Sequence, residues 1–146
     1  MERLTPLLAH GSQGIDQWQY VRQLGQAVAA AMRARAQLVR EFSQLDQTPA
    51  TALVRAGRIG ARCAPVFEDA RHEVALMTTP LGAQTIRDAL LGWLDVHVQV
   101  CGALVRAAGT RDPRHVGNAA AALGNAQPFA QRYNLARRRL AERLAA

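Results

Sequence analysis

Hydrophobic residues recur every three or four positions along most of the chain, the spacing that places them on one face of an α-helix. The pattern is clearest after Pro80, where the apolar stripe consists of Ile86, Leu90, Trp93, Leu94, His97, Cys101, Leu104 and Ala108. Many stripe positions elsewhere are Ala or Gly, so neighbouring helices should pack closely. No segment shows the alternation of apolar and polar residues that is typical of a β-strand. The pattern therefore predicts an all-α protein.

Three proline-containing dipeptides mark where helices should begin. Thr48-Pro49, Thr79-Pro80 and Asp112-Pro113 each join a side chain that can cap a helix to a proline that suits the first helical position. They predict three helices of roughly 30 residues, over 49–78, 80–108 and 113–145.

The first predicted helix ends near residue 46 and begins either near Ser12, or at Pro6 with a break at Gly11. The connections between the predicted helices are only a few residues long, so neighbouring helices must be antiparallel. We therefore expect residues 1–146 to form a single domain, an antiparallel up-down-up-down four-helix bundle. Residues 1–11 are expected to be part of it or a flexible or separate N-terminal segment.

Two further prolines, Pro65 and Pro128, lie inside the predicted second and fourth helices. Each removes an internal hydrogen bond, so each should kink its helix. Folding the helices against one another places both prolines near the level of Trp93. The kinks would either curve the helices around this bulky side chain or open a pocket beside Trp93 and Phe129.

The sequence also bears on the compartment. No uninterrupted apolar run approaches the roughly 18 residues of a membrane-spanning helix, and the N-terminus has no hydrophobic signal region. We expect a cytoplasmic protein that does not enter a membrane, unless an export signal has been trimmed from the sequence. Cys63 and Cys101 have no neighbouring metal ligands in sequence and should be unreactive core thiols.

One polar layer is a candidate ligand site. At a similar height in the predicted bundle lie Arg35, Gly60, His97 and Asn125. A buried arginine needs a partner, and no carboxylate lies on a core face at this level, so a small anionic ligand could bind here. The predicted ligand-binding residues are Arg35, Trp93, His97, Asn125 and Phe129. The alternative is that Arg35 extends into solvent and His97 is an ordinary core histidine.

A metal centre is less well supported. Asp69 and His72 have the i, i+3 spacing that di-iron bundles use, usually with Glu, but such a site needs the same motif on a second helix. Asp95 and His97 point to different faces, and Glu142 is the only acid in the last predicted helix. We therefore predict no metal and no cofactor, and the acidic cluster around Asp69 should be a solvated face.

Charge gives a second candidate site. The net charge is +7, and every positive side chain is Arg, which is also what a GC-rich gene would produce. The last predicted helix carries a basic group that could bind nucleic acid or another polyanion: Arg132, Arg137, Arg138, Arg139 and Arg143. Cations at a helix C-terminus are also favourable for the helix dipole alone.

Catalytic motifs are missing from the sequence. Ser12 and Ser43 are the only serines and neither lies in a Gly-x-Ser-x-Gly elbow, and the glycines form no phosphate-binding loop. The first hypothesis is therefore a non-catalytic binding or assembly module, acting on a protein partner, on a second copy of itself as a homo-oligomer, or on a small ligand. The alternatives are an accessory protein for nucleic acid or another polyanion, and a metal- or cofactor-dependent enzyme that uses His97.

Overall fold

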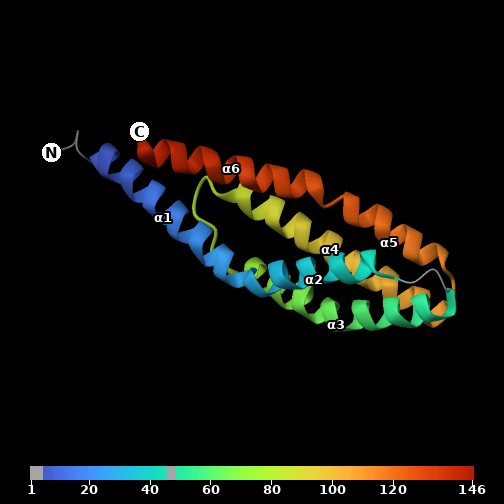
Figure 1. Cartoon of the computed structure of the whole chain (residues 1–146). Helices are drawn as coiled ribbons and strands as arrows, with labels where there is room; N and C mark the ends of the chain where they lie inside the picture. The colour runs from blue at the N-terminus through green and yellow to red at the C-terminus, as the bar shows by residue number, and fades with distance from the viewer. Residues whose placement is uncertain (1–4, 46–48) are drawn as a thin grey trace.

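The computed structural model describes the backbone of residues 5–45 and 49–146 and the side chains of residues 16–45 and 51–146. Within these residues the chain is entirely helical apart from its connections, which confirms the predicted all-α class (Figure 1). The helices are α1 (Thr5–Ala27), α2 (Ala29–Ser43), α3 (Pro49–Leu76), α4 (Gln84–Thr110), α5 (Arg114–Gly124) and α6 (Gln127–Ala145).

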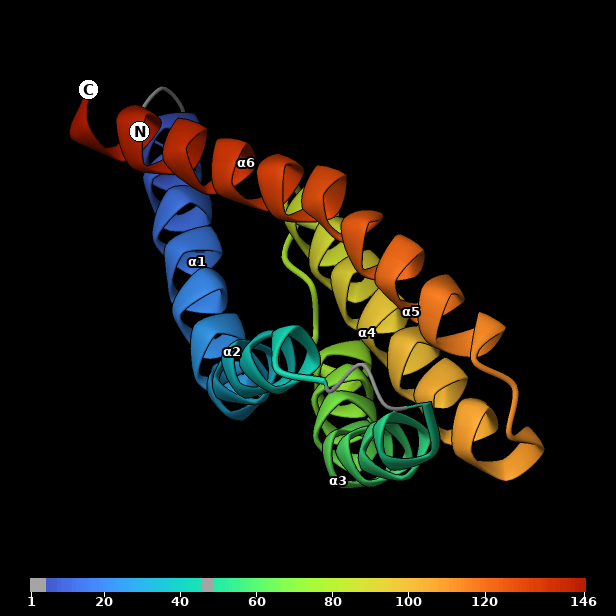
Figure 2. The ribbon, with the colours of Figure 1, turned by 45° about the vertical axis from the view of Figure 1, so that its right-hand side comes forward.

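The helix α4 lies at the centre of the arrangement. It packs against α3 along one side and against α5 and α6 along another, while α1 packs against α6 and α2 packs against α3 (Figures 1 and 2). The chain reverses direction between α2 and α3, between α3 and α4, and between α4 and α5. Six helices in the described residues replace the predicted four, so the four-helix count is not confirmed.

The first extra helix boundary lies at Val28. The prediction began the first helix either near Ser12, or at Pro6 with a break at Gly11. Instead, α1 runs without a break from Thr5 to Ala27, and the chain changes direction between α1 and α2 (Figure 2). Val28 has φ −101° and ψ 3°, outside the helical range, and its side chain is buried. No proline or glycine occupies this position. The bend therefore results from packing, because α1 packs against α6 whereas α2 packs against α3.

The second extra boundary lies just before Pro128. Asn125 and Ala126 donate their backbone N–H groups to carbonyls three residues back, forming a tight turn between α5 and α6. Pro128 then occupies the first turn of α6, where a missing N–H costs nothing. The predicted kink within one helix is therefore a separation into two helices. At Pro65, α3 continues without interruption, so the predicted kink there is not confirmed.

The start of α4 differs from the prediction. The Thr79-Pro80 pair does not cap it, because Leu81 and Gly82 form a turn in which Gly82 has φ +86°, and α4 begins at Gln84. The Thr79 hydroxyl instead lies 3.3 Å from the Tyr20 hydroxyl of α1. The Thr79 side chain, which the local pattern predicts as a helix cap, therefore contacts a distant segment instead.

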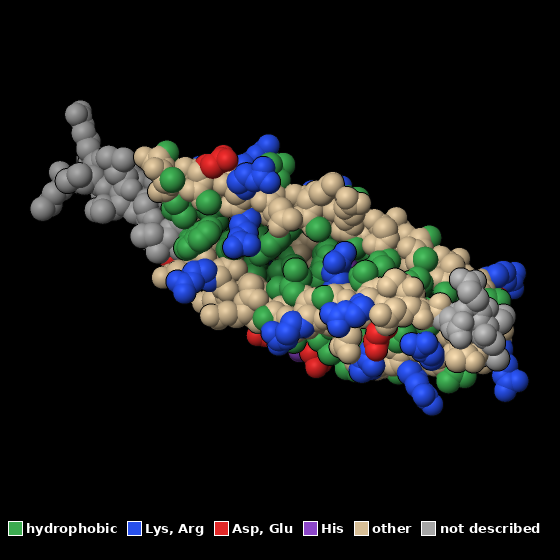
Figure 3. Space-filling model, viewed as in Figure 1, with side chains coloured by type: hydrophobic (Ala, Val, Ile, Leu, Met, Phe, Trp, Pro, Cys, Tyr) green, Lys and Arg blue, Asp and Glu red, His purple; other side chains and the backbone are tan. Residues whose placement is uncertain are grey.

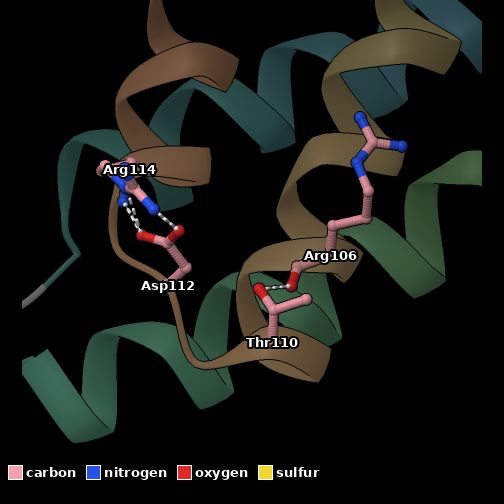
Figure 4. A network of polar contacts seen from close by, with 4 residues as sticks. All are labelled: Arg106, Thr110, Asp112 and Arg114. Carbon is pink, nitrogen blue, oxygen red and sulfur yellow. Dashed lines mark hydrogen bonds and ion pairs between the residues drawn. The ribbon is translucent and has the colours of Figure 1, made fainter.

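The turn between α4 and α5 comes closer to the prediction. The Asp112 carboxylate accepts the backbone N–H of Arg114 at 3.0 Å and the guanidinium of the same residue at 2.8 Å (Figure 4). The Thr110 hydroxyl donates to the Arg106 carbonyl at 2.7 Å. α5 begins at Arg114, one residue later than predicted. The predicted cap at Thr48 lies outside the described residues.

The tightest packing joins α3 and α4. A methyl group on Gly60 would lie 2.6 Å from the carbonyl oxygen of Cys101, and one on Gly57 would lie 2.4 Å from the Ala108 methyl carbon. The two backbones therefore approach closely only because these positions carry no side chain. The largest fully buried side chains nearby include Phe67, Leu94, Leu104 and His97.

By length and average hydropathy, α4 would also qualify as a membrane-spanning helix. The sequence shows no uninterrupted apolar run here, because polar residues such as Asp95 and His97 interrupt it. Of the apolar window in α4, 56% is buried inside the protein, as befits a helix that contacts neighbours on several sides.

Candidate ligand-binding groove

A groove runs along the seam between α1–α2 and α5–α6. It consists of three adjoining sections with volumes of about 500, 240 and 380 Å³. The first section, at the α2 end, includes Arg35, Val39 and Ala120, and the third, at the α1 end, includes Trp18 and Arg22. The middle section joins the two, because it shares lining residues with each of them.

The floor of the groove is apolar. Trp93 and Leu90 of α4 are buried at its base, and Trp93 borders both the first and the middle section. On the α2 bank Met32 is 54% exposed, which leaves a large apolar side chain open to solvent. On the opposite bank, Ala130 and Tyr133 of α6 complete the wall.

Arginines border this floor on both banks. Arg22 and Arg137 face the section at the α1 end, and Arg35 lies in the section at the α2 end. All three side chains are exposed, and none makes an ion pair within the described part of the chain. No carboxylate lines any of the three sections. The groove is therefore an apolar trough with a positive rim.

The space-filling view shows the same arrangement. Hydrophobic side chains gather along the seam between the two pairs of helices, and Lys or Arg side chains, which are all Arg in this chain, lie on either side (Figure 3). Contiguous apolar surface bordered by polar residues is typical of interaction sites.

Two features of the fold keep the seam open. The bend at Val28 sends α2 toward α3, and α2 does not pack closely on α5 or α6 within the described residues. Several of the residues that face the seam from α5 and the α5–α6 turn are also small, namely Ala120, Gly124 and Ala126. Small side chains on one bank and a diverging helix on the other leave volume that neither fills.

His97 lies behind the groove floor. Its side chain is 0% exposed, and its ring lies between the rings of Trp93 and Phe67, with centroid distances of 4.1 and 4.9 Å. The Nδ1–H group donates to the Trp93 carbonyl at 2.7 Å, which leaves Nε2 as a buried acceptor without a hydrogen-bond partner. His97 is thus a core residue that supports Trp93 from below.

Burial lowers the pKa of His97 to about 4, the hydrogen bond to the Trp93 carbonyl opposes this effect, and the positive charge of Arg35 adds to the lowering. The imidazole is therefore neutral near pH 7. Its pKa is far from the range in which a general acid or base works best. Burial also raises the pKa of Cys101 to about 12 and that of Cys63 above its usual range, so neither thiol ionises readily.

The structure brings together two of the five predicted ligand-binding residues. Arg35 and Trp93 line the same section of the groove. His97 is buried behind Trp93, Asn125 is exposed in the α5–α6 turn, and the ring of Phe129 packs against Gly92 of α4. Asn125 does not line the groove, although its neighbours Gly124 and Ala126 do.

Sequence reasoning missed several groove residues. The set on α1–α2 includes Arg22, Gly25, Ala29 and Met32, which are three or four residues apart, and the set on α6 includes Ala130, Tyr133 and Arg137. This spacing is the signal of a shared helix face. It could have been found, but the interrupted α1–α2 helix obscured which face pointed to α6.

The other predicted sites lie at the surface. Glu68, Asp69, His72 and Glu73 are exposed on α3. No group of three metal-ligating side chains occurs in the part of the chain that the structure describes. The basic residues Arg132, Arg138, Arg139 and Arg143 are all exposed on α6, and the guanidinium of Arg132 lies 5.5 Å from the centre of the Phe129 ring.

Comparison of the chain with protein-family models, with curated proteins and with solved structures finds no match in any of the three.

Proposed function

We propose that this protein is a non-catalytic helical binding module whose binding site is the groove between α1–α2 and α5–α6. In this view α1–α2 and α5–α6 each take the place of one helix in an antiparallel four-helix bundle. The bend at Val28 and the small side chains on the α5–α6 side leave the seam between them open to a ligand.

The observation that carries this proposal is the combination of an apolar floor with unpaired arginines on both banks. Covering the exposed side chain of Met32 would contribute favourable free energy, at about 25 cal/mol for each Å² of apolar surface removed from water. The guanidinium groups would select for negative charge at the edges of the ligand. A buried and neutral His97 supports a structural rather than a catalytic role for the only buried histidine in the described chain.

The test uses 8-anilinonaphthalene-1-sulfonate, an apolar dye with one negative charge. We expect stoichiometric binding with enhanced fluorescence, and we expect Met32→Glu to weaken it at least fivefold by placing a negative charge on the floor. Val54→Glu is the matched control, since Val54 on α3 is 53% exposed and lies outside the groove. Circular dichroism would verify that both variants are folded.

Ala130→Trp provides a second blocking variant, because Ala130 borders both the first and the middle section. Dye binding that survives both Met32→Glu and Ala130→Trp, or that is lost equally in Val54→Glu, would refute the assignment of the groove as the binding site.

A second candidate function is the binding of nucleic acid or another polyanion by α6. The observation in its favour is that Arg132, Arg139 and Arg143 are exposed and share one face of the helix, away from the groove residue Arg137. Binding through phosphate contacts should weaken steeply as salt rises. Changing Arg139 and Arg143 together to Ala should reduce the slope of log affinity against log salt, and an absence of DNA or RNA binding at low salt would end this proposal.

A further inference from the structure

We infer that the groove holds an acidic amphipathic helix of a partner protein, lying lengthwise between α1–α2 and α5–α6. This inference rests on the proposed function, since it names the occupant of the proposed site. It is carried by the length of the groove, by the chemistry of its walls and by the positions of its arginines.

The length fits a helix of several turns. Along α1–α2 the lining residues run from Trp18 to Val39, and along α5–α6 they run from Ala120 to Arg137. At 1.5 Å per residue these banks are roughly 25–30 Å long. A small molecule would fill only one of the three sections, whereas a helix of about 18 residues would cover all of them.

The walls favour a helix over an extended peptide. Both banks are α-helices whose backbone hydrogen bonds are internal, so the groove offers no free sheet edge. An extended segment would bury backbone N–H and C=O groups without partners, which is costly, whereas a helix satisfies its own. The small residues Gly25, Ala29, Ala126 and Ala130 let such a helix approach the banks closely.

The arginines set the charge and the register of the occupant. With three guanidinium groups and no carboxylate along the lining, an occupant without negative charge would cover cations and leave them unpaired. Arg22 and Arg137 lie at the same end, and Arg35 lies 13 residues after Arg22 along α1–α2. The occupant should therefore carry acidic residues at one end and another acidic residue about three to four helical turns away.

The probe is a fluorescein-labelled peptide of 18 residues with Leu at i, i+3, i+4 and i+7 spacing on one face and Glu on both flanks. Two matched peptides serve as controls, one with every Glu replaced by Lys and one with Pro at the centre to break the helix. Fluorescence anisotropy with the full chain should show binding of the acidic peptide at least tenfold tighter than of either control.

Protein variants locate the interaction. Arg137→Glu should weaken binding of the acidic peptide at least tenfold, while Arg58→Glu should change it less than threefold, because Arg58 is exposed on α3 outside the groove. In the double variant Arg22→Glu/Arg137→Glu, the Lys peptide should bind more tightly than it does to the natural sequence. A variant that merely unfolds would lose binding of both peptides, and it would not gain affinity for the Lys peptide.

Equal weakening by Arg137→Glu and Arg58→Glu would overturn the inference in favour of unspecific attraction to a basic protein. Equal binding of the helix-breaking peptide would overturn the helical occupant. If no peptide binds, two other results would assign the groove to a different occupant and overturn the inference. Displacement of the dye by vesicles of anionic phospholipid would assign it to a lipid, and self-association in sedimentation experiments would assign it to a second copy of the chain. Dye binding sensitive to Met32→Glu with no peptide binding would overturn this inference and leave the proposed function standing, whereas loss of both would overturn both.

Discussion

The buried histidine should make the stability of this protein depend on pH in a way that one substitution removes. His97 is fully enclosed between Trp93 and Phe67, and burial lowers its pKa to about 4 from an ordinary value near 6.5. Below pH 6.5 the unfolded chain takes up a proton on this imidazole, while the folded chain takes it up only near pH 4. His97 therefore costs no stability above pH 6.5 and destabilises the fold progressively as the pH falls from 6.5 to 4.

The size of the effect follows from the two pKa values. For a group with pKa about 4 when folded and roughly 6.5 when unfolded, the free energy of unfolding falls by about 2 kcal/mol between pH 7.5 and pH 5. The total loss below pH 4 is about 3 kcal/mol. For a domain with an unfolding free energy of about 5–15 kcal/mol, this is a substantial fraction.

The assay is urea denaturation followed by circular dichroism at pH 7.5 and pH 5, on the natural sequence and on His97→Leu. The leucine has a similar volume and removes both the titration and the unpaired Nε2 atom, so the variant should lose about 2 kcal/mol less than the natural sequence over this interval. Carboxylates that titrate in the same range cancel in the comparison. His72→Leu, on the exposed face of α3, is the control for replacing a histidine by leucine as such. Parallel profiles for the natural sequence and His97→Leu would refute the argument that burial keeps this imidazole neutral.

Two further predictions concern the close packing of α3 on α4. Gly60→Ala should destabilise the fold by about 1–3 kcal/mol in urea denaturation, because its methyl group would lie 2.6 Å from the Cys101 carbonyl oxygen and force the helices apart. Gly117→Ala in α5, where nothing lies within 4 Å, should instead stabilise by up to about 1 kcal/mol, and a result of the same sign for both glycines would contradict the packing argument. The native protein should leave Cys63 and Cys101 unreactive toward Ellman's reagent at pH 8, with two thiols appearing on denaturation, because both are buried and their pKa values are raised. Rapid labelling of the folded protein would show that these side chains reach solvent.

The apolar spacing along the chain determined the helical class and much of the core. The residues from Ile86 to Leu104 that the three-four pattern selected are buried in α4, and Pro49 begins α3 as its cap signal predicted. Asp112 accepts the first N–H of α5, although the helix begins one residue later than expected. These features are local: each depends on residues within one or two helical turns, so the sequence alone contains the information.

The sequence prediction also counted Arg35 and Trp93 among the ligand-binding residues, and both line the groove. It did not separate His97 from them, because a helical wheel cannot distinguish a side chain that faces a groove from one a turn away that faces α3. The ring of Phe129 packs against Gly92. These two residues are 37 positions apart in the sequence, so no local pattern predicts the contact.

Only the tertiary structure decided the bend at Val28 and the groove that follows from it. Position 28 carries neither proline nor glycine, and α1 and α2 diverge because one packs on α6 and the other on α3. Contacts between distant segments also determined the start of α4. Thr79 contacts Tyr20 of α1, Gly82 turns the chain, and α4 begins only at Gln84. Local spacing determines which residues prefer to be buried, but the burial available to each helix depends on where its neighbours lie, and that information is distributed over the whole chain.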